Sequence, residues 1–146
     1  MKNLTVKSSA FESGKPIPRK YSCHGEDINP PLTIEGTPKE AKSLVLTVDD
    51  PDAPSGTFDH WVVWNIPASA TTIEENSVPG TEGINGARKQ GYMGPCPPSG
   101  THRYFFKVYA LETELKLGGS SKKADVEKAM QGHVLAKGEL IGFFSK

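Results

Sequence analysis

The sequence has few of the features by which common structural classes are identified. It contains only two cysteines, Cys23 and Cys96, and neither belongs to a C-x-x-C pair of the kind that binds zinc or carries out redox chemistry. Two free thiols are the interpretation that we favour, and a single disulfide is the alternative. No apolar run is long enough to cross a membrane, and residues 1–7 contain no apolar segment of signal-peptide type. We therefore expect a cytoplasmic protein without a membrane span.

An excess of charge of either sign is also missing. Seventeen basic side chains balance seventeen acidic ones, so the formal net charge is zero. Without a global positive field, neither nucleic acid nor an anionic membrane surface is expected as a partner, whereas a local anion site is compatible with this composition. The 146 residues correspond to one domain, residues 1–146, which can bury roughly two thirds of its unfolded surface.

Helical periodicity is scarce, and most of the chain has the patterns of strands. Residues 43–50, 60–66 and 102–111 are the strongest strand candidates because β-branched and aromatic residues dominate them. Weaker candidates are residues 4–8, residues 31–34 as an edge strand, and residues 134–144 with a break at Gly138. The only convincing helix covers residues 122–131, with Ser120 or Ser121 as its cap and Gly132 as its stop. Residues 67–101 show no period, and a connection of that length is usually functional or disordered.

The alternation within the strong strands indicates which side chains share a face. In residues 43–50 both faces are apolar, which predicts a central strand, and Asp50 follows on the same face as Leu44, Leu46 and Val48. The connection to His60 is short and favours an antiparallel pair, so Asp50 and His60 are expected at one edge of the sheet. His102 and Tyr104 point the same way, and they join this edge if their strand is parallel to the strand of His60 or antiparallel to residues 43–50.

A stiff loop precedes His102. Three prolines and two glycines lie between Gly94 and Gly100, and we expect this loop to offer free N–H groups to a ligand. A carboxylate that accepts a hydrogen bond from an imidazole favours the charged ring, so two such histidines beside the loop would form a small anion pocket. Each feature also has a purely structural explanation, because Asp50-Pro51-Asp52 can be turn chemistry and His60 or Tyr104 can be core residues.

Motifs for catalysis are absent from the sequence. There is no G-x-S-x-G, H-E-x-x-H, Walker or dinucleotide-binding pattern, and Cys96 between prolines is a weak nucleophile candidate. No metal or cofactor is expected. We therefore favour a non-catalytic binding protein. The alternative is a small hydrolase or lyase that uses His60 and His102 as acid and base, with Asp50 orienting them.

Two segments resemble the signatures of the phosphatidylethanolamine-binding proteins, also called Raf kinase inhibitor-like proteins. They are Asp50-Pro-Asp-Ala-Pro54 with His60-Trp61, and Gly94-Pro-x-Pro-Pro-x-Gly-x-His-Arg-Tyr104. Residues 21–32 are similar to the bacterial and archaeal branch. The resemblance implies a mainly β fold, a sandwich of two antiparallel sheets with one or two short helices, and a pocket for phosphate, acetate, phosphoryl groups or a phosphoethanolamine head group. The implied pocket residues are Asp50, Asp52, Pro54, His60, Gly94, Pro95, Pro97, Pro98, His102 and Tyr104.

The sequence departs from that family in two places. Phe58-Asp59 replaces the Trp and His that eukaryotic members have there, and we expect Asp59 to lower the positive potential of the pocket. The sequence ends at Lys146 without the C-terminal helix of eukaryotic members, which implies a more open pocket and a homodimer. A protein partner, such as a kinase or protease contacted by residues 76–91, is a further hypothesis. If residues 21–29 fold over the rim of the pocket, Cys23 and Cys96 meet and the disulfide forms.

Overall fold

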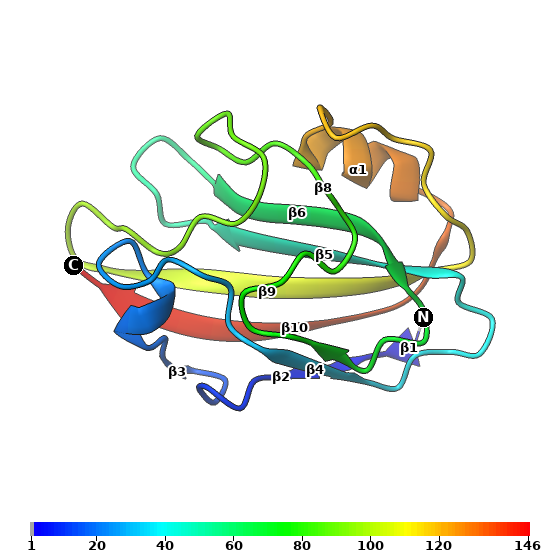
Figure 1. Cartoon of the computed structure of the whole chain (residues 1–146), viewed down its shortest axis with the longest axis horizontal. Coiled ribbons are helices and arrows are strands. Elements are labelled where there is room, and N and C mark those ends of the chain that lie inside the picture. Colours follow the sequence, from blue (N-terminus) through cyan, green and yellow to red (C-terminus); the bar gives the residue numbers. More distant parts are fainter. Residues whose placement is uncertain (1) are drawn as a thin grey trace.

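Two β-sheets and one α-helix make up the fold in the computed structural model, which describes residues 2–146 (Figure 1). The long strands are β5 (Ser43–Asp50), β6 (Phe58–Pro67), β9 (Thr101–Leu111) and β10 (Val134–Ser145). The short strands are β1 (Lys2–Asn3), β2 (Thr5–Lys7), β3 (Lys15–Pro16), β4 (Leu32–Glu35), β7 (Thr72–Ile73) and β8 (Thr81–Glu82). The helix α1 covers Lys123–Met130, and a single 3-10 turn covers Arg19–Tyr21. The predicted mainly β architecture with one or two short helices is therefore confirmed.

Neighbouring long strands of the large sheet are antiparallel to one another, so the end of one strand lies beside the start of the next at the same edge. Its strand order is β1-β10-β9-β5-β6-β8, with β3 also paired to β10. Strand β5 is central, as its two apolar faces predicted, and it is antiparallel to both β6 and β9. The short strands β1 and β3 pair with β10 in parallel, so the sheet is not purely antiparallel.

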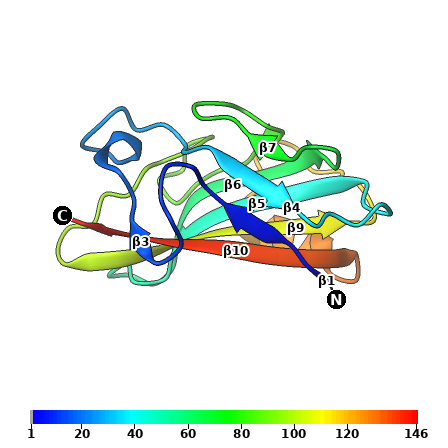
Figure 2. The ribbon, with the colours of Figure 1, turned by 90° about the horizontal axis from the view of Figure 1, so that it is seen from below.

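The small sheet covers one face of the large sheet. Its order is β2-β4-β7, which makes β4 its middle strand rather than the edge strand that we predicted for residues 31–34. The prediction was wrong because the partner strand β7 has only two residues and leaves no recognisable pattern. Figure 2 shows β2, β4 and β7 lying across β10, β9 and β5. Leu32 and Ile34 of β4 join Leu44, Leu46 and Phe106 in the main hydrophobic core between the sheets.

The helix α1 covers the other face of the large sheet (Figure 1). Val126 and Met130 of α1 pack with Val45, Val62 and Trp64 in a second, smaller core. Neither Ser120 nor Ser121 is the cap that we predicted. The cap position is Lys122, whose backbone N–H donates to Oδ2 of Asp125 at 2.9 Å. The Asp125 carboxylate, three residues into the helix, thus accepts a hydrogen bond from an N–H group that would otherwise be unpaired.

Two glycine-related predictions have different outcomes. Gly132 follows the helix with a φ of +81°, as expected for a glycine stop. Gly138 does not break β10, which runs continuously from Val134 to Ser145. A Cβ at Gly138 would collide with the carbonyl oxygen of Leu4, so this glycine lets the N-terminal segment approach the sheet. No helix within residues 2–146 is long and apolar enough to span a membrane.

Candidate functional site

Three strand ends meet at one edge of the large sheet. Asp50 is the last residue of β5, while His60 and His102 lie near the starts of β6 and β9. The three come together because β5 is antiparallel to both neighbours, which was predicted for β6 and was the condition stated for the strand of His102. The C-terminus lies at the same end of the molecule (Figure 1), since Ser145 of β10 pairs with Thr101 of β9.

Asp50 holds His102 in a fixed orientation. Nδ1 of His102 lies 2.6 Å from Oδ2 of Asp50, and both side chains are buried. Because a carboxylate can only accept, Nδ1 carries the proton and Nε2 is the nitrogen left for a ligand. The other carboxylate oxygen of Asp50 accepts the backbone N–H of Asp52 at 2.8 Å. Both oxygens of Asp50 are thus engaged, and the turn after β5 is tied to the histidine.

Asp52, a predicted pocket residue, lies outside the cavity lining and binds Arg103. It accepts two hydrogen bonds from the Arg103 guanidinium and one from the Arg103 backbone N–H, each at 2.9 Å. These bonds, the guanidinium contact above all, lower the pKa of Asp52 to about 2. Arg103 therefore has a structural role beside the site.

A bulge sets the direction of His60. Trp61 pairs with Val48 and Asp59 with Asp49, so His60 is an extra residue in β6 without a partner in β5. Bulges of this kind re-aim side chains, and they are frequent beside functional sites. Nδ1 of His60 donates to the carbonyl oxygen of Met93 at 2.8 Å, which again leaves Nε2 for a ligand. Burial lowers the pKa of His60, against the opposing effects of the Met93 carbonyl and Asp50, so the neutral ring is favoured.

Tyr104 lies between the two histidines with an unpaired hydroxyl. Its ring centroid is 5.3 Å from that of His60 and 6.5 Å from that of His102. The side chain is 1% exposed, and its hydroxyl makes no hydrogen bond of acceptable geometry among the described residues, although the Asp50 carboxylate lies near it. Burial and the nearby Asp50 carboxylate raise the pKa of Tyr104, so the hydroxyl keeps its proton and is a donor. A buried unpaired hydroxyl is costly, which points to a ligand that accepts from it.

These side chains line a cavity of about 360 Å³. Of the ten residues predicted for the pocket, the lining includes Asp50, Pro54, His60, Pro97, Pro98, His102 and Tyr104. It also includes four residues that the sequence analysis did not select, namely Ala53, Phe58, Met93 and Cys96. Phe58 could have been found, because it lies two residues before His60 in the same strand. Met93 carries no sequence signal, since its contact depends on the path of the long loop.

The loop before β9 is a stiff wall whose N–H groups are partly occupied. Gly94 and Pro95 were predicted pocket residues, but both lie outside the lining. The N–H of Gly94 donates to Oδ1 of Asp27 at 2.7 Å, and that of Met93 donates to the carbonyl of His60 at 2.9 Å. The prolines have no N–H to offer. The prediction of a free N–H group is therefore wrong at Gly94, because Asp27 occupies this donor.

Asp59 does not face the cavity, contrary to expectation. Its Oδ1 lies 2.8 Å from Nζ of Lys123 in α1, on the opposite face of the sheet. Asp49, which alternation placed on that face, also pairs with Lys123, at 3.2 Å. Phe58 is the residue that faces the cavity, with its ring 4.9 Å from the His60 ring and edge-on to it. The cavity therefore gains an aromatic wall and no additional carboxylate from this segment.

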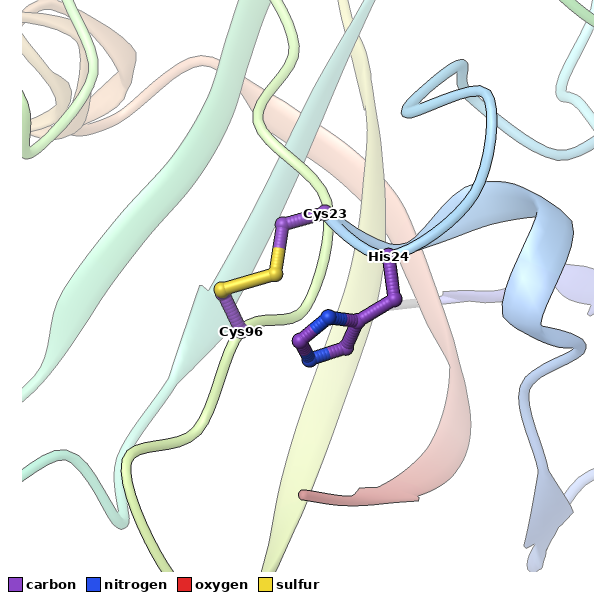
Figure 3. Close-up of side chains that lie close together, drawn as sticks. All are labelled: Cys23, His24 and Cys96. Atoms are coloured by element: carbon purple, nitrogen blue, oxygen red, sulfur yellow. A yellow bond between two sulfur atoms is a disulfide. The ribbon is translucent and has the colours of Figure 1, made fainter.

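Cys23 and Cys96 form a disulfide in the structure, with their Cα atoms 5.5 Å apart (Figure 3). The prediction of two free thiols, which we favoured, was therefore wrong. The alternative, a single disulfide, is present. The reason is the contact between residues 21–27 and the loop before β9. There the N–H of Cys23 donates to the carbonyl of Pro95 at 3.1 Å, and the hydroxyl of Tyr92 donates to the carbonyl of Tyr21 at 2.9 Å.

A larger hollow of about 990 Å³ lies at the opposite end of β5 and β6. It is open and lined by short polar side chains, with Lys7 and Glu35 as an exposed pair 3.6 Å apart. No buried titratable group faces it, so it offers no chemistry comparable to the histidine cavity.

Comparison with known proteins agrees with this architecture. The family model "Phosphatidylethanolamine-binding protein" matches residues 7–145. A "UPF0098 protein" from Methanothermobacter thermautotrophicus is 49% identical, with 98% of this chain and 99% of that protein covered. The crystal structure of a phosphatidylethanolamine-binding protein homologue from Chlamydia trachomatis has a TM-score of 0.96 at 41% identity, covering 100% of this chain and 99% of that one. The crystal structure of Escherichia coli YBCL, described as a new member of the mammalian PEBP family, has a TM-score of 0.90 at 30% identity, covering 99% of each chain. The chain belongs to the phosphatidylethanolamine-binding protein family.

Proposed function

We propose that the protein binds a small anion, such as phosphate, acetate or a phosphoryl head group, in the histidine cavity and does not transform it. The observation that carries this proposal is the Tyr104 hydroxyl, which is buried, protonated and unpaired among the described residues while it borders the cavity. An anion oxygen would accept from it and remove the cost of the unpaired donor.

The two histidines supply further ligand contacts. In both rings Nδ1 is engaged, with Met93 in one case and Asp50 in the other, so each Nε2 remains for the ligand. His60 is favoured as the neutral ring in the free protein, because burial lowers its pKa. A bound anion would stabilise the protonated ring, so binding takes up a proton. Affinity for a non-titrating anion is therefore expected to increase as the pH falls.

The size and walls of the cavity favour a small organic anion. A volume of about 360 Å³ is at the lower end of the range for small-molecule sites. Pro54, Phe58 and Met93 provide apolar walls beside the polar end. The name of the matching family model makes phosphoethanolamine one ligand to test. Regulation of a kinase or protease through this pocket remains a further proposal. Formation of a homodimer is another.

Acid–base catalysis is the second candidate, and the Asp50–His102 pair is the observation that favours it. A reaction would need a nucleophile, and the lining contains no serine, threonine or lysine. Cys96 is held in the disulfide, and the Tyr104 hydroxyl keeps its proton. Without a serine, threonine, lysine or free cysteine in the lining, a reaction would depend on water or on a histidine Nε2 as the nucleophile, so we favour binding without turnover.

Calorimetric titration of the oxidised protein with phosphate, acetate and phosphoethanolamine tests the proposal. We compare wild type with Tyr104→Phe, which removes only the donor, and with Tyr109→Phe as the matched control. Tyr109 lies on the same strand but on the other face, outside the cavity lining. Tyr104→Phe should weaken binding about tenfold, the size of one hydrogen bond to a charged group, while Tyr109→Phe should not. Equal affinity in all three proteins, or no binding at millimolar ligand, would refute the proposal.

Turnover is measured on the same samples. Product formation from phosphomonoesters that is lost in His102→Ala would favour the hydrolase instead. Its absence together with tight binding supports a binding protein.

A further inference from the structure

His24 lies beside the disulfide and completes a group of three metal-ligating residues. One ligand atom from each of Cys23, His24 and Cys96 lies within 4.8 Å of the others, and all three residues are exposed. Figure 3 shows the imidazole of His24 beside the disulfide. His24 was not a candidate in the sequence, because the second cysteine is 73 residues away from the first. The cluster exists only in the folded chain.

We propose that reduction of the disulfide turns this cluster into a binding site for a thiophilic divalent cation, with Zn²⁺ as the best match. A dithiol supplies two electrons and two protons: the bond between the two Sγ atoms breaks, both cysteines become thiols, and the dithiol becomes a disulfide. Zn²⁺ then binds two thiolates and one imidazole nitrogen, and two thiol protons are released. The oxidised protein has no such site, because a disulfide sulfur is not a thiolate ligand.

The distances fit this coordination. Zn–S bonds of about 2.3 Å and Zn–N bonds of about 2.0 Å place tetrahedral ligand atoms roughly 3.5–3.8 Å apart. The three present ligand atoms span up to 4.8 Å, so the imidazole approaches by about 1 Å. The two sulfurs separate by about 1.7 Å when the bond is cut. Rotation of the three side chains can supply both movements, because all three residues are exposed.

The backbone around the cluster is held by contacts other than the disulfide. Cys23 N–H donates to the Pro95 carbonyl at 3.1 Å, and Gly94 N–H donates to Asp27 at 2.7 Å. These bonds keep the two cysteines adjacent after reduction. They provide a preformed site, which lowers the ordering cost of binding a metal.

His24 is also oriented by its neighbours. Its backbone N–H donates to Oγ of Ser22 at 3.1 Å, and its ring stacks on that of Phe144 with centroids 6.5 Å apart and an interplanar angle of 20°. Three protein ligands leave the fourth position of a tetrahedral Zn²⁺ open, as in catalytic rather than structural zinc sites. Cys96 also lines the histidine cavity. The open position would therefore lie at the mouth of that cavity, within reach of an incoming anion.

Cobalt titration of the full chain tests the site independently of anion binding. The protein is reduced with dithiothreitol, the reductant is removed without oxygen, and Co²⁺ is added. We expect thiolate-to-cobalt charge-transfer absorption at one equivalent, its displacement by Zn²⁺, and no such band in the oxidised protein. His24→Ala should weaken Co²⁺ binding at least tenfold while two thiols remain countable. His133→Ala is the matched control, because His133 pairs with Glu112 far from the cluster and should leave the titration unchanged.

Circular dichroism of the reduced, metal-free protein accompanies the titration. A native spectrum is expected, because the hydrogen bonds between residues 21–27 and the loop persist. The proposal is overturned if reduced wild type shows no charge-transfer band, if His24→Ala binds Co²⁺ like wild type, or if reduction abolishes the fold on which the cluster depends.

Discussion

The buried contact between His102 and Asp50, with Nδ1 2.6 Å from Oδ2, connects the binding cavity to the turn that follows β5. Asp50 also accepts the Asp52 N–H, and Asp52 in turn binds Arg103, the neighbour of His102. One carboxylate therefore orients the ligand-binding ring and closes the turn at the same time. Substitution of Asp50 should disturb both functions.

Asp50→Asn tests this double role. Both oxygens of Asp50 accept hydrogen bonds, from His102 and from the Asp52 N–H. An amide has only one acceptor oxygen, so its NH₂ group must face one of these two donors. We expect a loss of about 1–3 kcal/mol in the free energy of unfolding and roughly tenfold weaker sulfate binding, measured by urea unfolding and calorimetry. Glu40→Gln, at an exposed position, is the control. A variant as stable as this control would contradict the role given to Asp50.

The burial of His60 predicts how stability depends on pH. Its folded-state pKa is lowered, mainly by burial, whereas an unfolded histidine titrates at about 6.5. Between these values the unfolded chain binds more protons, so stability is complete above pH of about 6.5 and decreases as the pH falls below it. The urea midpoint measured from pH 8 to 5 should therefore fall. The fall should be smaller in His60→Gln, and in wild type with saturating sulfate. If the urea midpoint falls equally with pH in wild type and in His60→Gln, His60 is not the group responsible.

Lys123 should be important for attachment of α1 to the sheet. Its ammonium group lies 3.2 Å from Asp49, which is 3% exposed, and 2.8 Å from Asp59. Removal of Lys123 leaves the buried carboxylate of Asp49 with only Lys107, at 3.5 Å. We expect Lys123→Ala to cost about 3 kcal/mol in the free energy of unfolding, whereas Lys128→Ala, exposed on the same helix, should change it by less than about 0.5 kcal/mol. Indistinguishable unfolding midpoints would mean that the ion pairs are solvated and contribute little.

The disulfide should contribute strongly to stability because it closes a long loop. Cys23 and Cys96 are 73 residues apart, and loop-closure entropy of that length corresponds to about 4 kcal/mol. Urea unfolding of oxidised protein and of Cys23→Ser/Cys96→Ser should show this loss, with a larger m-value in the variant because its unfolded state is less compact. Equal free energies of unfolding would indicate that the unfolded chain keeps residues 23 and 96 together without the bond.

The strand alternation was the part of the fold that could be predicted reliably. Leu44, Leu46 and Val48 lie in the main core and Val45 lies in the second core, as their alternation indicated. The antiparallel arrangement of β5 with β6 followed from their short connection, whereas the sequence left open the direction of β9, which follows a long connection and is given by the structure. The alternation and the short connection are local, so a single sequence contains them.

The long connections were predicted poorly. In the loop before β9, the N–H of Gly94 donates to Asp27, which belongs to a distant part of the chain. The sequence of the loop alone therefore does not show whether this donor is free. The bulge at His60 depends on pairing with β5 and has no local pattern. Cytoplasmic location and homodimer formation remain predictions. Among the described residues, Val78 is the large hydrophobic side chain that is strongly exposed, and this gives an apolar dimer surface little support.

The sequence by itself determined the strands, their faces and the edge at which Asp50 and His60 meet, because a period of two residues and a short connection are properties of neighbouring residues. The pairing of β9 with β5, which brings His102 to the same edge, came from the tertiary structure. Only the tertiary structure decided that Tyr104 keeps an unpaired hydroxyl, that Asp59 turns toward α1, and that Cys23, His24 and Cys96 form one cluster. Those outcomes depend on contacts between segments tens of residues apart. Packing selects such contacts when the whole chain folds, and no local pattern specifies them.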